Sequence, residues 1–181
     1  MSDEKSPISF EVDVTRIPAK GMRVTVTPDA DERTSLATMH GLEEVLTFKA
    51  DLLVTQWRKD GAHIEGRINA TIIQTCVVTL EPLTSKLDVD VDIVMVPEGS
   101  KLARPKFDES GELVLSAEGA DPPDTFSGVM IDVGAQAEEH FALAIDPYPR
   151  KTGASLPAAD NDEGDEKLSP FSKLADWQPK Q

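Results

Sequence analysis

Apolar and polar residues alternate with a period of two along much of the chain. The alternating stretches cover residues 10–15, 22–27, 46–58, 63–79 and 87–96. Alternation of this kind is typical of strands that bury one face and expose the other. Pro18 and Gly21 predict a turn between the first two strands, and the three longer stretches predict an antiparallel meander that bends near Gly66.

Two stretches have the apolar spacing of helices instead. We expect Asp31 to cap a helix that ends near His40, with Leu36, Ala37 and Met39 as its apolar positions. Asp132 is expected to cap a second helix that runs through Ile145, because the following Asp146-Pro147 stops a helix. Residues 97–123 are rich in proline, glycine and charge, which predicts a long connection, and residues 129–131 predict a short strand.

These elements predict an α+β fold, because a sheet with one solvated face needs its other face covered by the helices. We expect a single domain over residues 1–150, mostly antiparallel sheet with two helices, and then a flexible acidic tail over residues 151–181. Residues 151–168 hold too few apolar side chains to order themselves. Phe171, Leu174 and Trp177 recur beyond them at near-helical spacing. Such a set either packs on its own domain or docks on a partner.

The net charge of the chain indicates which class of partner it can attract. The chain carries 33 Asp and Glu side chains against 18 Lys and Arg, a net charge of −15. Because this field repels phosphate, an extended nucleic-acid groove is not expected, and the predicted partner is a basic protein. Lys101, Arg104 and Lys106 form a basic island in the long connection. They are either a solvated loop or a weak local contact to RNA.

No residue pattern predicts catalysis or a cofactor. Asp88, Asp90 and Asp92 alternate on one strand face, but Ile93 and Gly99 stand where a calcium loop needs Gly and Glu, so a solvated strand face is expected. The single cysteine, Cys76, has no second thiol and no nearby histidine, which predicts a structural residue without a metal.

The histidines do not change this prediction. His40, His63 and His140 are scattered, and Glu138, Glu139 and His140 predict an exposed helix face. The first residues are polar and no apolar run approaches the length of a bilayer span, so we expect a monomeric cytoplasmic protein that contacts no membrane.

Two blocks of sequence resemble those of a known family. Residues 66–71 with 74–82 resemble the central signature of the YceD family, and residues 131–139 with 143–151 resemble its second block. Pro170-Phe171 with Leu174 is similar to the short ending that many members carry. Many members also carry a Cys-x-x-Cys pair, whereas here Thr79 takes the second position.

The resemblance implies an accessory factor in the accumulation of large-subunit ribosomal RNA, without a catalytic centre. We expect it to act as an adaptor that binds a basic protein, and the resemblance implies a ribosomal protein or an RNA-processing factor as that partner. Three alternatives stay open: a direct RNA-binding protein that uses the basic loop at residues 101–107, a β-rich carrier of a small ligand, or an enzyme whose polar cluster assembles only in the folded chain.

Overall fold

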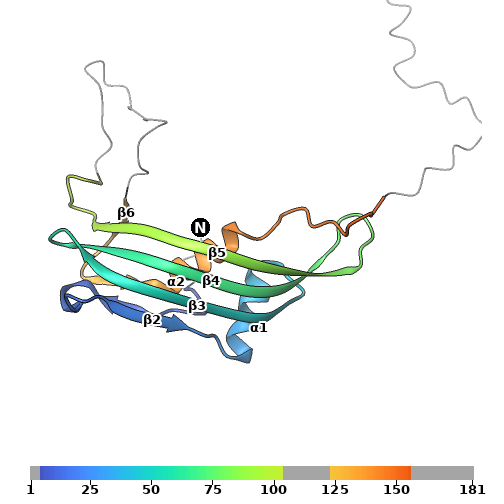
Figure 1. The fold of residues 1–181 in the computed structure, drawn as a ribbon, viewed down its shortest axis with the longest axis horizontal. Coiled ribbons are helices and arrows are strands. Elements are labelled where there is room, and N and C mark those ends of the chain that lie inside the picture. The colour runs from blue at the N-terminus through green and yellow to red at the C-terminus, as the bar shows by residue number, and fades with distance from the viewer. Residues whose placement is uncertain (1–4, 104–122, 156–181) are drawn as a thin grey trace, which may run out of the picture.

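The computed structural model describes residues 5–103 and 123–155, and it shows an α+β domain built on two sheets of very different size (Figure 1). The larger sheet has the order β2-β3-β4-β5-β6, in which β2 to β5 run antiparallel and β6 is parallel to β5. Its strands are β2 (Met22–Val26), β3 (Glu44–Trp57), β4 (Gly61–Thr75), β5 (Pro82–Pro97) and β6 (Asp124–Phe126). The predicted meander and the α+β class are therefore confirmed.

The smaller sheet joins the N-terminal segment to the strand that precedes α2. It pairs β1 (Glu11–Asp13) with β7 (Met130–Asp132), and a 3-10 turn, Val14–Arg16, follows β1. The expected turn at residues 18–21 forms, with the Gly21 amide donating to the Pro18 carbonyl at 2.8 Å. The first two strands nevertheless belong to different sheets.

Both helices cover the same face of the large sheet. α1 (Ala30–Met39) packs against β3, and α2 (Val133–Leu143) packs against β4 and β5 (Figure 1). The Phe141 ring lies edge-on to Phe48 of β3, with ring centroids 5.4 Å apart. Neither helix among the described residues is long and apolar enough to cross a membrane.

The alternation along β4 shows why the helices are needed. Ile64, Ile68 and Ile72 are fully buried under them, whereas Glu65 and Arg67 point to the open face. Burial of a large aliphatic side chain contributes about 1.5–3 kcal/mol, so this row supplies much of the stabilisation of the core.

The helix ends differ in part from the prediction. Asp29, not Asp31, caps α1: its carboxylate accepts from the Asp31 and Glu32 amides, and Glu32 bonds back to the Asp29 amide in a capping box. Asp29 takes this role because its backbone is extended, whereas Asp31 already lies in the first turn. Met39 is also 38% exposed and not a core residue. Asp132 caps α2 as expected, and the helix ends at Leu143.

The predicted exposed face of α2 is wrong at Glu138. This residue is only 7% exposed, and its carboxylate lies 3.1 Å from Nε2 of His40 at the end of α1. His40 in turn lies edge-on to the Phe141 ring, at 5.7 Å between centroids. The pair therefore joins the two helices over the sheet, while the neighbouring Glu139 is exposed as predicted.

The aspartate row of β5 forms the solvated strand face that the alternation predicts. Arg67 of β4 reaches Asp90 at 2.7 Å and Asp88 at 3.3 Å, and His63 reaches Asp92 at 2.7 Å. The Asp90 hydrogen bond and the two carboxylates raise the pKa of Arg67 above its ordinary value. All three aspartates are well exposed, so these pairs add little to stability.

Gly66 allows β4 to pass β3 at the centre of the sheet. Its φ is +155°, and a Cβ at this position would collide with the carbonyl oxygen of Asp51. The ladder nevertheless continues through the Leu52–Gly66 pair without a shift of register. The expected bend at Gly66 is thus a local backbone feature that only glycine accommodates.

We predict that Gly66→Ala lowers the free energy of unfolding by about 1–3 kcal/mol or more, because the strained φ and the collision act together. Urea denaturation of the two proteins measures it. Gly99→Ala is the matched control, since a Cβ there meets no atom within 4 Å, and we expect a near-neutral effect. Equal stabilities of the wild type and Gly66→Ala would contradict this account of the sheet.

Replacing Glu138 by Ala should lower the free energy of unfolding by about 1–3 kcal/mol, because it leaves the mostly buried His40 ring without the Glu138 carboxylate. Glu139→Ala, one residue along the same helix, should change it by less than about 0.5 kcal/mol. Thermal or urea denaturation at one fixed pH tests both. A larger effect at Glu139 than at Glu138 would show that the helix contact is assigned wrongly.

Candidate functional site

The 76–81 turn connects β4 to β5 and departs most clearly from the expected structure. The alternation predicted strand through Thr79, but β4 ends at Thr75. The Leu80 amide donates to the Cys76 carbonyl at 2.9 Å, and the Cys76 amide donates to the Glu81 carbonyl at 2.9 Å. Leu80 adopts a positive φ of 57°, which is rare for a non-glycine residue and costs about 1–3 kcal/mol. The surrounding contacts must therefore hold this turn in place.

The segment after α2 supplies those contacts. The side-chain amide of Gln74 donates to the Asp146 carbonyl at 2.9 Å, and the Val77 amide donates to the Pro149 carbonyl at 2.9 Å. The Lys151 amide then donates to the Cys76 sulfur at 3.3 Å. Residues 146–151 thus run across the turn, which brings together two regions that are about seventy residues apart.

An ion pair closes the same junction. Nζ of Lys151 lies 2.8 Å from Oε2 of Glu81, which lowers the pKa of that carboxyl and raises the pKa of the lysine. Both side chains are more than half exposed, so solvent screens the pair and it contributes little energy. Its value is positional, because it fixes the chain where it leaves the turn.

Cys76 lies beneath this junction and is buried, as expected. Its sulfur also accepts hydrogen bonds. The Thr79 hydroxyl and the backbone amides of Thr79, Lys151 and Val78 lower the pKa of the thiol to about 6, although burial opposes the shift. Thr79 therefore stabilises the thiolate from the position where many members of the resembled family carry a second cysteine. Among the residues that the structure describes, no three His, Cys, Asp or Glu side chains gather as metal ligands.

Large apolar side chains project outward from the junction. Val77 is 44% exposed, Leu80 76% and Tyr148 70%, and the two hydrogen-bonded segments carry all three. We call these three residues the turn surface. Apolar groups that are held rigidly and left in water are typical of a contact site for another protein. Sequence reasoning missed them, because the alternation predicts a strand through residue 79 and the segment after Ile145 is expected only to stop a helix.

The family comparison covers this junction. A family model described as "Large ribosomal RNA subunit accumulation protein YceD" matches residues 64–177. The chain belongs to the YceD family. Neither the curated proteins nor the solved structures include a match. The two sequence blocks that resemble the YceD family are therefore the two segments that the structure joins at the 76–81 turn.

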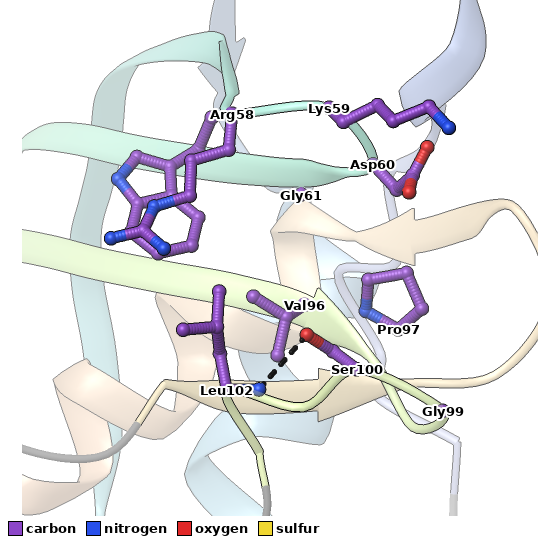
Figure 2. A pocket seen from close by; sticks show the side chains of 10 residues that line it. Arg58, Lys59, Asp60, Gly61, Val96, Pro97, Gly99, Ser100 and Leu102 are labelled. Atoms are coloured by element: carbon purple, nitrogen blue, oxygen red, sulfur yellow. Dashed lines mark hydrogen bonds between the residues drawn. The ribbon is translucent and has the colours of Figure 1, made fainter.

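The opposite end of the large sheet holds a second candidate site in this YceD protein. A depression of about 320 Å³ lies between the β3–β4 turn and the segment after β5, and Trp57, Arg58, Lys59, Ser100 and Leu102 help to line it (Figure 2). The guanidinium of Arg58 stacks over the Trp57 ring, 4.4 Å from its centroid. Such a pair offers a flat, positively charged face.

Only part of the predicted basic island can be placed. Lys101 is exposed and follows Ser100 on the segment that lines the depression. Arg104 and Lys106 lie outside the described residues, as do Phe171, Leu174 and Trp177 of the predicted docking set. The roles of these residues stay predictions.

The thiol of Cys76 gives a pH prediction with a defined sign. Its pKa is about 6 in the folded protein and near 9 in an unfolded chain, so the unfolded state binds more protons between these values. The contribution of the Cys76 thiolate to the free energy of unfolding should therefore be complete above pH 9, and it should be lost as the pH falls through 6. Relative to Cys76→Ser, the wild type should become more stable as the pH rises from 6 to 9.

Thiolate absorbance near 240 nm checks this directly, because Cys76 is the only cysteine in the chain. We expect a midpoint of about 6 in the folded protein, and no such transition in Cys76→Ser. A midpoint between 8 and 9 would show that the hydrogen bonds do not stabilise the thiolate.

Proposed function

We propose that this protein is an accessory factor in the accumulation of large-subunit ribosomal RNA, and that it acts in the cytoplasm as an adaptor for a basic protein. Its membership of the YceD family supports the first part, since the family is described by that role. The observation that supports the adaptor is the turn surface. In this proposal Val77, Leu80 and Tyr148 contact the partner.

The construction of the junction favours binding over catalysis. Hydrogen bonds from Gln74, Val77 and Lys151 hold the turn surface in one conformation, so a partner loses little free energy in ordering it. Rigid apolar and aromatic anchors of this kind supply most of the affinity at protein interfaces. The predicted apolar set at Phe171, Leu174 and Trp177 would add a second anchor for the same partner.

Charge supports a basic partner. The described residues carry 20 Asp and Glu side chains against 13 Lys and Arg, a net −7, so a surplus remains without the acidic tail. A field of this sign accelerates encounter with a cation and is screened over about 10 Å at 0.1 M salt.

Direct RNA binding is the second candidate function, and the depression in Figure 2 is the observation that favours it. A nucleobase could stack on the Arg58 guanidinium above Trp57, while Lys59 and Lys101 contact phosphate. Few cations take part, so this mode predicts a shallow salt dependence.

Replacing Leu80 by Asn and Tyr148 by Ser should abolish the adaptor function without unfolding the protein. Asn tolerates the positive φ of Leu80, and both side chains are mostly exposed. In cells that lack the wild-type protein, we expect the double variant to leave large-subunit ribosomal RNA low relative to small-subunit RNA. We also expect it to lose a partner that the wild type retains after nuclease treatment.

Met39→Gln with Val129→Thr is the matched control, because it removes exposed apolar groups elsewhere and should restore the RNA ratio. Retention of full function by the turn-surface variant would refute the adaptor site. Loss of function in Arg58→Ala with Lys101→Ala, together with nuclease-sensitive partners, would favour the RNA alternative.

A further inference from the structure

Among the residues that the structure describes, one edge of β5 has no strand partner over most of its length. On one side the strand pairs with β4 from Pro82 to Met95, whereas on the other it pairs with β6 only from Met95 to Pro97. In the described part of the chain, no backbone hydrogen bond reaches residues 84–93 from that open side. We call residues 84–93 the β5 edge. In an antiparallel ladder, every second residue of an edge strand directs its N–H and C=O away from its neighbour.

The β5 edge is also apolar on its inner face. Leu87 and Val89 pack against the core, yet both remain partly exposed, unlike Val91 and Ile93 farther along the strand. The helices therefore cover the inner face of β5 fully only toward its C-terminal half. An added strand would bury the exposed parts of Leu87 and Val89 as it completed the backbone hydrogen bonds.

The outer face of the same edge carries Asp88, Asp90 and Asp92. Residues directly opposite on paired strands have Cβ atoms about 4.5–5.5 Å apart, and like charges there are destabilising. A second copy of the chain paired antiparallel along this edge would place aspartates near aspartates. The row therefore opposes self-association through β5 and favours a strand that carries cations at alternate positions.

The internal partners of the aspartates do not neutralise this row. Arg67 pairs with both Asp88 and Asp90, and His63 pairs with Asp92, while Glu65 lies beside Asp92 in the β4–β5 register. Four carboxylates thus share one arginine and one histidine as ion-pair partners, and Lys86 is a further cation on the same face of β5. Their surplus charge faces solvent next to the free edge.

We propose that the β5 edge binds an extended segment of a basic protein by strand addition, with Lys or Arg at alternate positions over the aspartate row and apolar residues against Leu87 and Val89. This deepens the adaptor function and rests on it. β5 begins at Pro82, directly after the 76–81 turn, so an added strand would continue the surface that Val77 and Leu80 begin.

A fluorescent ten-residue peptide that alternates Lys and Val tests the proposal on the full chain. Anisotropy should show binding, and backbone amides within residues 84–93 should gain protection from hydrogen exchange. Replacing all three aspartates by Asn should weaken the affinity on the order of tenfold, since each opposite-charge pair contributes about 0.2–1 kcal/mol. Asp31→Asn, Glu44→Gln and Glu139→Gln remove the same charge from exposed sites elsewhere and should weaken it far less.

Two N-methylated peptides separate strand addition from charge attraction. Methyl groups on every Lys amide block one edge of the peptide, and methyl groups on every Val amide block the other, with no change in charge. We expect one pattern to abolish binding and the other to preserve it. Equal binding by both would overturn strand addition, as would binding of a ten-residue single-stranded RNA without binding of the peptide.

The outcome is separable from the adaptor function itself. If a basic partner depends on Leu80 and Tyr148 while the β5 amides show no protection, the edge proposal fails and the adaptor remains. If the peptide protects β5 but the turn-surface variant retains full activity in cells, the edge stands and the turn surface fails.

Discussion

The contact of Phe141 with Phe48 holds the described fold together. It fixes α2 on the sheet, and the same ring meets His40, which Glu138 binds, so α1 is fixed by the same cluster. The described residues that follow α2 depend on this placement. Because the helix ends at Leu143, residues 146–151 reach the 76–81 turn, and their hydrogen bonds hold Leu80 in a conformation that it rarely adopts. The site is therefore a consequence of core packing at a distance.

The sequence predicts this core well, because a strand that is buried on one face has apolar and polar residues that alternate with a period of two. Ile64, Ile68 and Ile72 show it along β4, and Asp88, Asp90 and Asp92 show it on the open face of β5. It fails at residues 76–79, whose β-branched side chains favour strand locally. There the chain turns because its hydrogen-bond partners come from residues 149–151, and contacts so distant in sequence leave no periodic signal.

Similar reasons explain the other misses. Asp29 and Asp31 are equally good caps by residue type, and only the extended backbone of Asp29 distinguishes them. The sequence predicts Glu138 as a surface residue, because its contact with His40 of α1 forms only in the folded protein. β6 has three residues, too few for a period to appear. The candidate site is the part that the sequence predicts least well, since Val77, Leu80 and Tyr148 form one surface only in the folded protein.

The distribution of charge limits what electrostatics can do for this protein. On β2 and β3, the open face is balanced, because Arg23 and Lys49 offset Glu44 and Asp51, whereas on β4 and β5 Glu65 and the three aspartates outnumber Arg67 and Lys86. The uncompensated charge of that face lies at its β5 margin. Exposed ion pairs contribute about 0–1 kcal/mol each. Charge at this margin can therefore add specificity and raise the association rate, but it supplies little of the affinity. Affinity must come from groups that are buried from water when the partner binds. In the described chain these groups are the unpaired backbone of β5, the exposed parts of Leu87 and Val89, and the apolar side chains of the turn surface.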